Sequence, residues 1–239
     1  GEAAWVAMRV RYRRHLAQLA AWDLCQPDPL AAVDRVAAAL ADLAGAALDA
    51  AILVARNEVT FPADDVAATR FSIIGMGKAG ARELNYLSDV DVIFVVESGG
   101  DLTDDRAVQI GTRLAMATMK GINDLAAEPG LWEVDANLRP EGKDGALVRT
   151  LDSHVAYYER WAKSWEFQAL LKARPLAGDR ELGQRYVDAL APMVWSSASR
   201  ENFVESVQRM RERVTANIPS GELDVQLKLG PGGLRDVEF

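Results

Sequence analysis

The segment at residues 89–96 constrains the fold of this chain more than any other feature. Acidic and apolar residues alternate at its start and β-branched residues fill its centre, a pattern typical of a β-strand. Asp89 and Asp91 leave the same face of this strand, with Cα atoms roughly 6–7 Å apart. The opposite face carries the apolar residues Val90, Val92, Phe94 and Val96. Because two neighbouring carboxylates repel each other unless a cation lies between them, the segment predicts a cation site at the start of a buried strand.

A second acidic strand is predicted at residues 132–138, where polar and apolar residues alternate strictly. Its polar face carries Glu133, Asp135 and Asn137, followed by Arg139. If the two strands are neighbours, Asp135 converges with Asp89 and Asp91. An isolated Asp-x-Asp is more often a solvated sheet edge, so this matching strand is what favours a metal site.

Three carboxylates with only oxygen ligands suit Mg²⁺ or Mn²⁺, which bridge substrate phosphates. Two such ions can hold the attacking and leaving oxygens of a displacement at phosphorus. We therefore predict Asp89, Asp91 and Asp135 as catalytic residues and as ligands of two divalent ions.

A glycine-rich turn follows a short strand predicted at residues 71–74. Gly75, Gly77 and Gly80 match the G-x-G-x-x-G pattern of dinucleotide-binding proteins. That alternative is disfavoured because the helix expected at residues 81–86 is short and the next strand opens with two aspartates. A Walker A loop is excluded, since Ala79 follows Lys78. We expect the turn to present backbone N–H groups to a phosphate, with Lys78 or Arg82 adding positive charge.

The rest of the chain is mainly helical in its spacing. Helical periods occur at residues 3–56, 104–122, 153–173 and 181–217, with Asp28 as a cap inside the first of these ranges. Residues 221–229 predict a last strand, and a glycine loop follows it. The fold class is therefore α+β. We expect a helical region at 1–60, a catalytic core at 61–150, and a helical region with a terminal strand and glycine loop at 151–239.

Composition narrows the classes of protein to consider. The chain has 239 residues, a net charge of −8 and one cysteine. An acidic chain of this kind is unsuited to binding a nucleic-acid backbone, and one cysteine allows no intramolecular disulfide. We find no signal peptide and expect no membrane span, so a reducing, cytoplasmic location is expected. The helical pattern is already under way at the first residue, which predicts a piece of a longer polypeptide.

The order of these features resembles the polymerase-β-like nucleotidyltransferase superfamily, in which a strand, a small turn and a D-x-D strand precede a third acidic strand. Longer strings are similar to the family of glutamine-synthetase adenylyltransferase/adenylyl-removing enzymes. The strings lie at residues 75–94, 134–142, 165–174 and 228–239. The resemblance covers residues 60–239, and the strings occur in the same order as in the family. The helical first quarter matches only in its general helical character. Ala79, Ala81 and Leu87 depart from the usual residues, and none of them is a predicted ligand.

This resemblance implies a polymerase-β-like nucleotidyltransferase core within a chain that has two homologous halves. The first half removes AMP from a tyrosine of glutamine synthetase, using phosphate and releasing ADP, and the second attaches AMP from ATP. The tail from Lys228 to Asp236, with its Gly232-Gly233 pair and Arg235, favours the removing half. We therefore expect deadenylylation of glutamine synthetase, a regulatory step in nitrogen assimilation. ATP-dependent adenylylation is the alternative, and a non-catalytic regulatory module is a more remote one.

The resemblance also implies the remaining partners and site residues. Glutamine synthetase is the expected protein substrate, phosphate and ADP or ATP are the expected small partners, and a PII-type signalling protein is expected to act on the full-length enzyme. Because the attacking group is itself a phosphate, further cationic groups are required near the carboxylates. The residues predicted to bind nucleotide or phosphate are Gly75, Gly77, Lys78, Arg82, Ser88, Arg139, Lys172 and Arg174.

Overall fold

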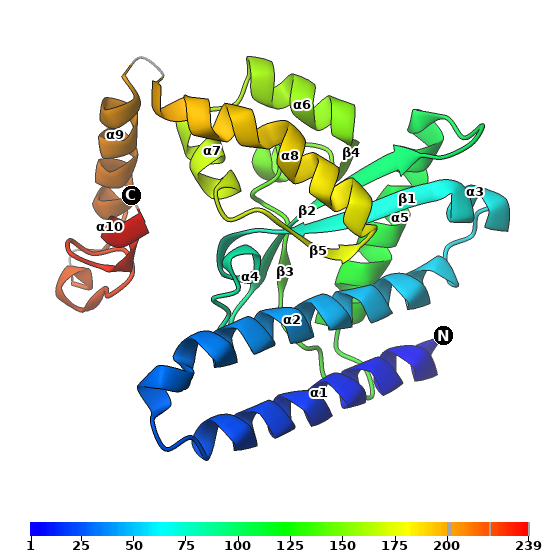
Figure 1. Ribbon diagram of the computed structural model, residues 1–239, viewed down its shortest axis with the longest axis horizontal. Coiled ribbons are helices and arrows are strands. Elements are labelled where there is room, and N and C mark those ends of the chain that lie inside the picture. The colour runs from blue at the N-terminus through cyan, green and yellow to red at the C-terminus, as the bar shows by residue number, and fades with distance from the viewer. Residues whose placement is uncertain (200–201, 220, 239) are drawn as a thin grey trace.

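A mixed five-stranded sheet lies at the centre of the computed structural model, which describes residues 1–199, 202–219 and 221–238 (Figure 1). The strands are β1 (Thr69–Gly75), β2 (Val90–Ser98), β3 (Val134–Asp135), β4 (Val148–Thr150) and β5 (Arg174–Gly178). β1 is antiparallel to both β2 and β5. β3 and β4 both pair in parallel with β2, one after the other along its free edge. The expected α+β class is confirmed.

The sheet is covered by helices on both faces, because both faces of β2 are apolar. Val90, Val92, Phe94 and Val96 are fully buried in one cluster with the first two helices and α5. Ile93 and Val95 are fully buried in a second cluster with residues of α6, α7 and α8. The face that carries Asp89 and Asp91 is therefore polar only at the start of the strand.

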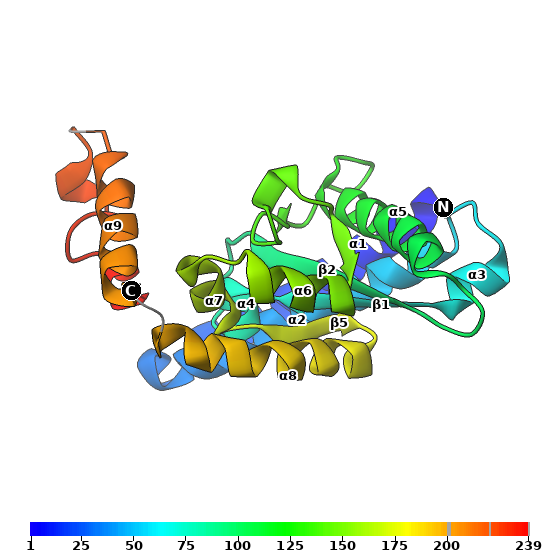
Figure 2. The ribbon, with the colours of Figure 1, turned by 90° about the horizontal axis from the view of Figure 1, so that it is seen from above.

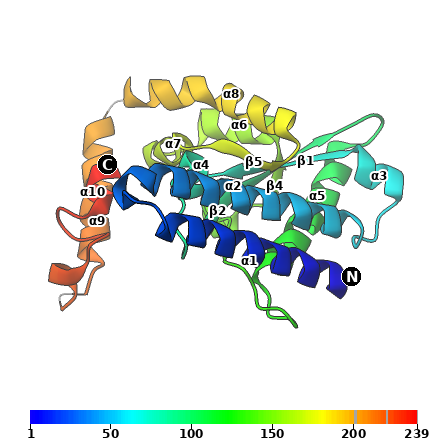
Figure 3. The ribbon, with the colours of Figure 1, turned by 60° about the horizontal axis from the view of Figure 1, so that its bottom comes forward.

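Two long helices form an antiparallel hairpin beneath the sheet (Figures 1 and 3). They are α1 (Glu2–Leu24) and α2 (Pro29–Arg56), and α5 (Asp104–Asn123) packs beside them. The Asp28 side chain accepts hydrogen bonds from the backbone N–H groups of Leu30 and Ala31, which confirms the predicted cap. By length and composition α2 is apolar enough to cross a membrane, yet half of its most apolar window is buried inside the fold. It is a core helix of this structure.

The other face of the sheet is covered by α6 (Leu151–Arg160), α7 (Ser164–Leu170) and α8 (Arg180–Ser196). Two short helices, α3 (Ala63–Ala68) and α4 (Gly77–Ala81), flank β1. The last helices, α9 (Phe203–Ala216) and α10 (Leu234–Glu238), lie beyond one end of α8 (Figure 2). Short 3₁₀ turns occupy Gly142–Asp144, Ser197–Ser199 and Leu223–Val225.

Several predicted elements differ from the observed ones. The helical period over 181–217 is split between α8 and α9, and residues 200–201 within it lie outside the described part of the chain. The strand predicted at 221–229 is wrong, because that segment forms a 3₁₀ turn and tight turns. The third strand is confirmed only at its centre, where two residues pair with β2. β5 was not predicted, although it completes the sheet from beyond residue 150.

Candidate metal centre

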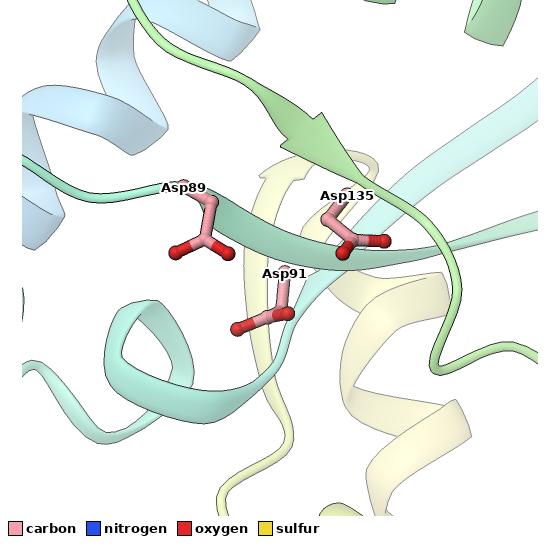
Figure 4. Close-up of side chains that lie close together, drawn as sticks. All are labelled: Asp89, Asp91 and Asp135. Carbon is pink, nitrogen blue, oxygen red and sulfur yellow. The ribbon is translucent and has the colours of Figure 1, made fainter. Parts of the chain in front are cut away.

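Three carboxylates meet where β2 and β3 lie side by side (Figure 4). Asp89 directly precedes β2, and the parallel register places Asp91 of β2 opposite Asp135 of β3. One oxygen of each carboxylate lies within 4.8 Å of the others. The two acidic strands are therefore neighbours, and their three aspartates converge as expected from the sequence.

The electrostatics of the cluster favour a cation. Asp89 is exposed, whereas Asp91 and Asp135 are half-buried. Burial raises the pKa of the Asp91 carboxyl, and the negative charges of Asp89 and Asp135 raise it further, while Lys78 and Lys228 act in the opposite direction. A divalent cation among the three carboxylates would reverse the sign of this repulsion. Oxygen-only ligation fits Mg²⁺ or Mn²⁺, so the residues present suit the expected metal.

Backbone hydrogen bonds hold the three aspartates in place. The Met76 N–H donates to the Asp91 carbonyl at 2.9 Å, and the Val90 N–H donates to the Glu133 carbonyl at 2.9 Å. The Asn137 N–H donates to Asp135 Oδ1 at 2.7 Å. These bonds tie β2 to the glycine turn on one side and to β3 on the other, so the positions of the carboxylates follow from the sheet.

At two positions the backbone of the glycine turn lies so close to neighbouring oxygen atoms that only glycine fits. Gly77 has φ +49°, and a Cβ there would lie 2.6 Å from Asp91 Oδ2. A Cβ at Gly80 would lie 1.9 Å from the Lys172 carbonyl oxygen. The helix of this turn is α4, at Gly77–Ala81, and not at residues 81–86 as predicted. Gly75 packs against the Leu176 side chain of β5.

The dinucleotide-binding alternative is wrong. That fold requires parallel strands joined by a crossover helix. Here β1 and β2 are antiparallel, and only the short α4 and a loop connect them.

Four of the predicted phosphate-binding residues surround the turn and already have polar contacts. Lys78 Nζ donates to Asn85 Oδ1 at 3.2 Å, and Lys172 Nζ donates to Glu83 at 3.1 Å. Arg82 forms an ion pair with Asp42 of α2, and Ser88 Oγ donates to the Asp89 carbonyl at 2.7 Å. Three of these contacts involve exposed side chains, Lys78 with Asn85, Lys172 with Glu83 and Arg82 with Asp42, so solvent or a phosphate can replace the present partner.

Arg139 and Arg174 bind backbone carbonyl groups. Arg139 donates to the carbonyls of Ala136, Lys143 and Gly145, at 2.8, 3.0 and 3.2 Å. Arg174 donates to the carbonyls of Ala79 and Gly80, at 2.9 and 3.0 Å. Each guanidinium therefore ties down a loop beside the carboxylates. Arg174 Nη1 also lies 3.9 Å from Asp42 Oδ1. Since an arginine has five N–H groups, each guanidinium has more donors than these carbonyl contacts use.

Aromatic residues of α6 and α7 pack against each other. Tyr158 and Phe167 are buried with ring centroids 5.8 Å apart. His154 of α6 is also buried, and burial lowers its pKa to about 3. The charge of Lys228 near Asp91 was missed, because only tertiary structure brings the tail and β2 together.

Comparison with known proteins identifies the family. A sequence profile of the family described as "Glutamate-ammonia ligase adenylyltransferase" matches residues 2–189. The chain belongs to this family. The match includes the helical first quarter, which the sequence strings had left out. The expected family resemblance is therefore confirmed, and it extends to the N-terminal helices.

Individual relatives of the chain share one name with each other. The chain is 72% identical over 246 residues to a protein of Leifsonia xyli, a match that covers 100% of the chain and 24% of the relative. A Streptomyces avermitilis protein is 58% identical over 98% of the chain and 23% of its own length. A Bifidobacterium longum protein is 50% identical over 100% of the chain and 22% of its own length. Each is named a bifunctional glutamine synthetase adenylyltransferase/adenylyl-removing enzyme. The chain spans about a quarter of the length of these relatives.

Proposed function

We propose that this chain is a metal-dependent nucleotidyl-transfer domain that removes AMP from the adenylylated tyrosine of glutamine synthetase. Phosphate is the attacking group and ADP is the product. The observation that carries this proposal is the convergence of Asp89, Asp91 and Asp135 at the paired ends of two strands. The names of the relatives supply the protein substrate, and the tail with Arg235 favours removal over attachment. The core is proposed to be of the polymerase-β-like type.

The three aspartates would hold two Mg²⁺ or Mn²⁺ ions, which supply positive charge to the phosphate oxygens when they are bound. A phosphate oxygen attacks the phosphorus of AMP, the bond from that phosphorus to the tyrosine oxygen breaks, and the phenolate takes up a proton. The chain contributes position and charge more than covalent chemistry. We also propose that Gly75, Gly77 and Ser88 bind the nucleotide phosphate beside the carboxylates.

Cationic side chains would neutralise the second phosphate, which carries its own negative charge. Lys78 and Arg82 lie on the glycine turn and Lys172 on the loop before β5, and we propose this role for all three. Arg139 and Arg174 would use their remaining N–H groups while they hold the adjacent loops. We propose these five residues as the anion-binding set.

The second candidate function is ATP-dependent attachment of AMP to the same protein. The relatives' name covers both directions.

We further propose that a PII-type signalling protein acts on the full-length enzyme and that the enzyme is located in the cytoplasm.

An assay pair tests the function. Adenylylated glutamine synthetase, phosphate and Mn²⁺ should yield ADP, whereas unmodified glutamine synthetase and ATP should incorporate no AMP. EDTA should abolish ADP release, and Asp89→Asn should reduce it by at least about 100-fold while the protein stays folded. Asp101→Asn, which changes an exposed acid beyond the opposite end of β2 from the carboxylates, is the matched control and should retain full activity.

Full ADP release by the Asp89→Asn variant, with unchanged metal dependence, would contradict the ligand assignment. AMP incorporation from ATP would reverse the proposed direction. If the wild-type protein has neither activity, the regulatory-module alternative gains support.

A further inference from the structure

An exposed apolar surface lies beside the metal centre, and we call it the apolar patch. Its residues are Trp22, Leu24, Leu30, Val33, Tyr86 and Leu87. Leu24, Leu30 and Leu87 are 86%, 85% and 90% exposed. Single exposed leucines are ordinary, but several gathered on one surface mark a place where another surface binds.

The patch draws on two segments that are distant in the sequence, residues 22–33 of the helical hairpin and residues 86–87 of the loop before β2. The Tyr86 hydroxyl donates to Asp23 Oδ2 at 2.9 Å, which joins the loop after α4 to the end of α1. The ion pair between Arg82 and Asp42 ties the same loop to α2. Leu30 and Val33 lie three residues apart on α2 and therefore share one face of the helix.

The patch also adjoins the carboxylates. Leu87 precedes Asp89 by two residues, so their Cα atoms are at most about 7 Å apart. A tyrosine side chain holds its phenol oxygen only a few bonds from its own backbone. A folded protein whose tyrosine reaches Asp89 must therefore bring its surface over Leu87 and the residues around it.

The rim of the patch has more acidic than basic residues. Asp23, Asp28 and Asp34 lie beside its apolar residues, and Asp28 and Asp34 are exposed. Among the described residues of this rim, Arg35 is the cation, and its guanidinium lies 5.1 Å above the Trp22 ring. This charge selects a binding surface that has apolar side chains at its centre and basic side chains around them.

We infer that the apolar patch is the docking surface for the protein substrate, a folded protein that presents its nucleotidylated tyrosine among apolar and basic residues. This inference rests on the proposed function, because it names how the substrate of that same site is held. Docking at the patch orients the tyrosine toward the carboxylates. It also separates recognition of the protein from recognition of the nucleotide.

The test compares a protein substrate with a small one in the protein as it occurs in the cell. The variants are Leu24→Ser with Leu30→Ser, and Leu87→Ser alone. The substrates are adenylylated glutamine synthetase and the AMP ester of N-acetyl-tyrosinamide, each with phosphate and Mn²⁺. We expect kcat/KM for the protein substrate to fall by about 10-fold or more, as for central interface residues. Turnover of the small ester should stay within about two-fold of the wild type.

Leu53→Ser is the matched control. Leu53 is also an exposed leucine of α2, but it lies about 30 Å along the helix from Val33. It should change neither reaction.

Equal losses on both substrates would overturn the inference, because they would show a structural effect on the site. Unchanged kcat/KM for the protein substrate would overturn it too. A loss of thermal stability in the patch variants would assign the patch to packing within the protein and would overturn the inference as well. If the wild type turns over neither substrate, it is the proposed function that fails, and the docking inference fails with it.

Discussion

At the scale of single residues, Gly77 connects the glycine turn to the metal centre. Its φ of +49° lies in the left-handed region, and its missing Cβ leaves space for Asp91 Oδ2. Gly100 has a similar φ of +59°, but nothing lies within 4 Å of the position where a Cβ would be. The two glycines therefore share a backbone constraint and differ in what surrounds them.

Substitution of each glycine by alanine separates these effects. Gly77→Ala and Gly100→Ala should each lower the free energy of unfolding by about 1–2 kcal/mol, because alanine disfavours a positive φ. Only Gly77→Ala should also weaken Mn²⁺ binding, by about 10-fold or more, because its methyl group displaces the Asp91 carboxylate. Urea titration and Mn²⁺ titration by calorimetry measure the two effects. Equal Mn²⁺ affinity in the two variants would show that the space beside Asp91 is not required.

At the scale of elements, Arg70 of β1 connects β2 with the start of α8. It lies on β1 and forms ion pairs with Glu97 of β2 at 3.0 Å and with Asp179 at 2.6 Å. The Asp179 carboxylate also accepts the Leu182 N–H and so caps α8. The Arg70 guanidinium lowers the pKa of Asp179, and Arg185 together with Arg70 lowers the pKa of Glu97.

These shifts predict an acid dependence of stability. A carboxylate whose pKa is lower in the folded state stabilises the fold above its unfolded pKa, about 3.9 for Asp and 4.3 for Glu, and loses that contribution as the pH falls toward the folded pKa. Arg70→Gln should cost about 1–2 kcal/mol at pH 7 and should flatten the loss of stability between about pH 5 and pH 3. Arg113→Gln, an exposed change on α5, should leave the curve as in the wild type. Urea unfolding at several pH values measures the stability of both variants. If the stability of Arg70→Gln falls as steeply at acid pH as that of the wild type, the Arg70 ion pairs do not cause the acid dependence.

At the scale of the whole molecule, the helical hairpin is part of the core that positions the site. Leu48 of α2 is fully buried in the cluster beneath the sheet, and Gly45 approaches the Leu176 carbonyl of β5. The residues predicted as a separate N-terminal region thus pack directly on the strands. That division of the chain stays a prediction, but the family match from residue 2 is consistent with one continuous structure.

Two substitutions on α2 test this packing. Leu48→Ala should lower the free energy of unfolding by about 2–5 kcal/mol, because it removes buried methyl groups and leaves a cavity beneath the sheet. Leu53→Ala should change it by less than about 0.5 kcal/mol, since Leu53 is 65% exposed. Comparable small effects at both positions would show that α2 is not part of the core.

The sequence by itself determined the local pattern of the site. Alternation around Asp89 and Asp91 predicted a strand with one buried face, and the second alternating segment predicted where Asp135 would lie. Such patterns are readable because neighbouring residues on a strand point to opposite faces, whatever the rest of the chain does. Helical spacing likewise predicted helices over residues 3–56 and the Asp28 cap between them.

Only the tertiary structure decided which distant segments meet. β5 pairs with β1 from across the chain, Arg139 and Arg174 hold backbone carbonyls, and Lys228 contributes charge near Asp91. The direction of a long cationic side chain depends on the acceptors that folding brings within reach. Local periodicity does not predict which acceptors these are. The cationic residues could therefore be identified from the sequence, whereas their partners follow only from the tertiary structure.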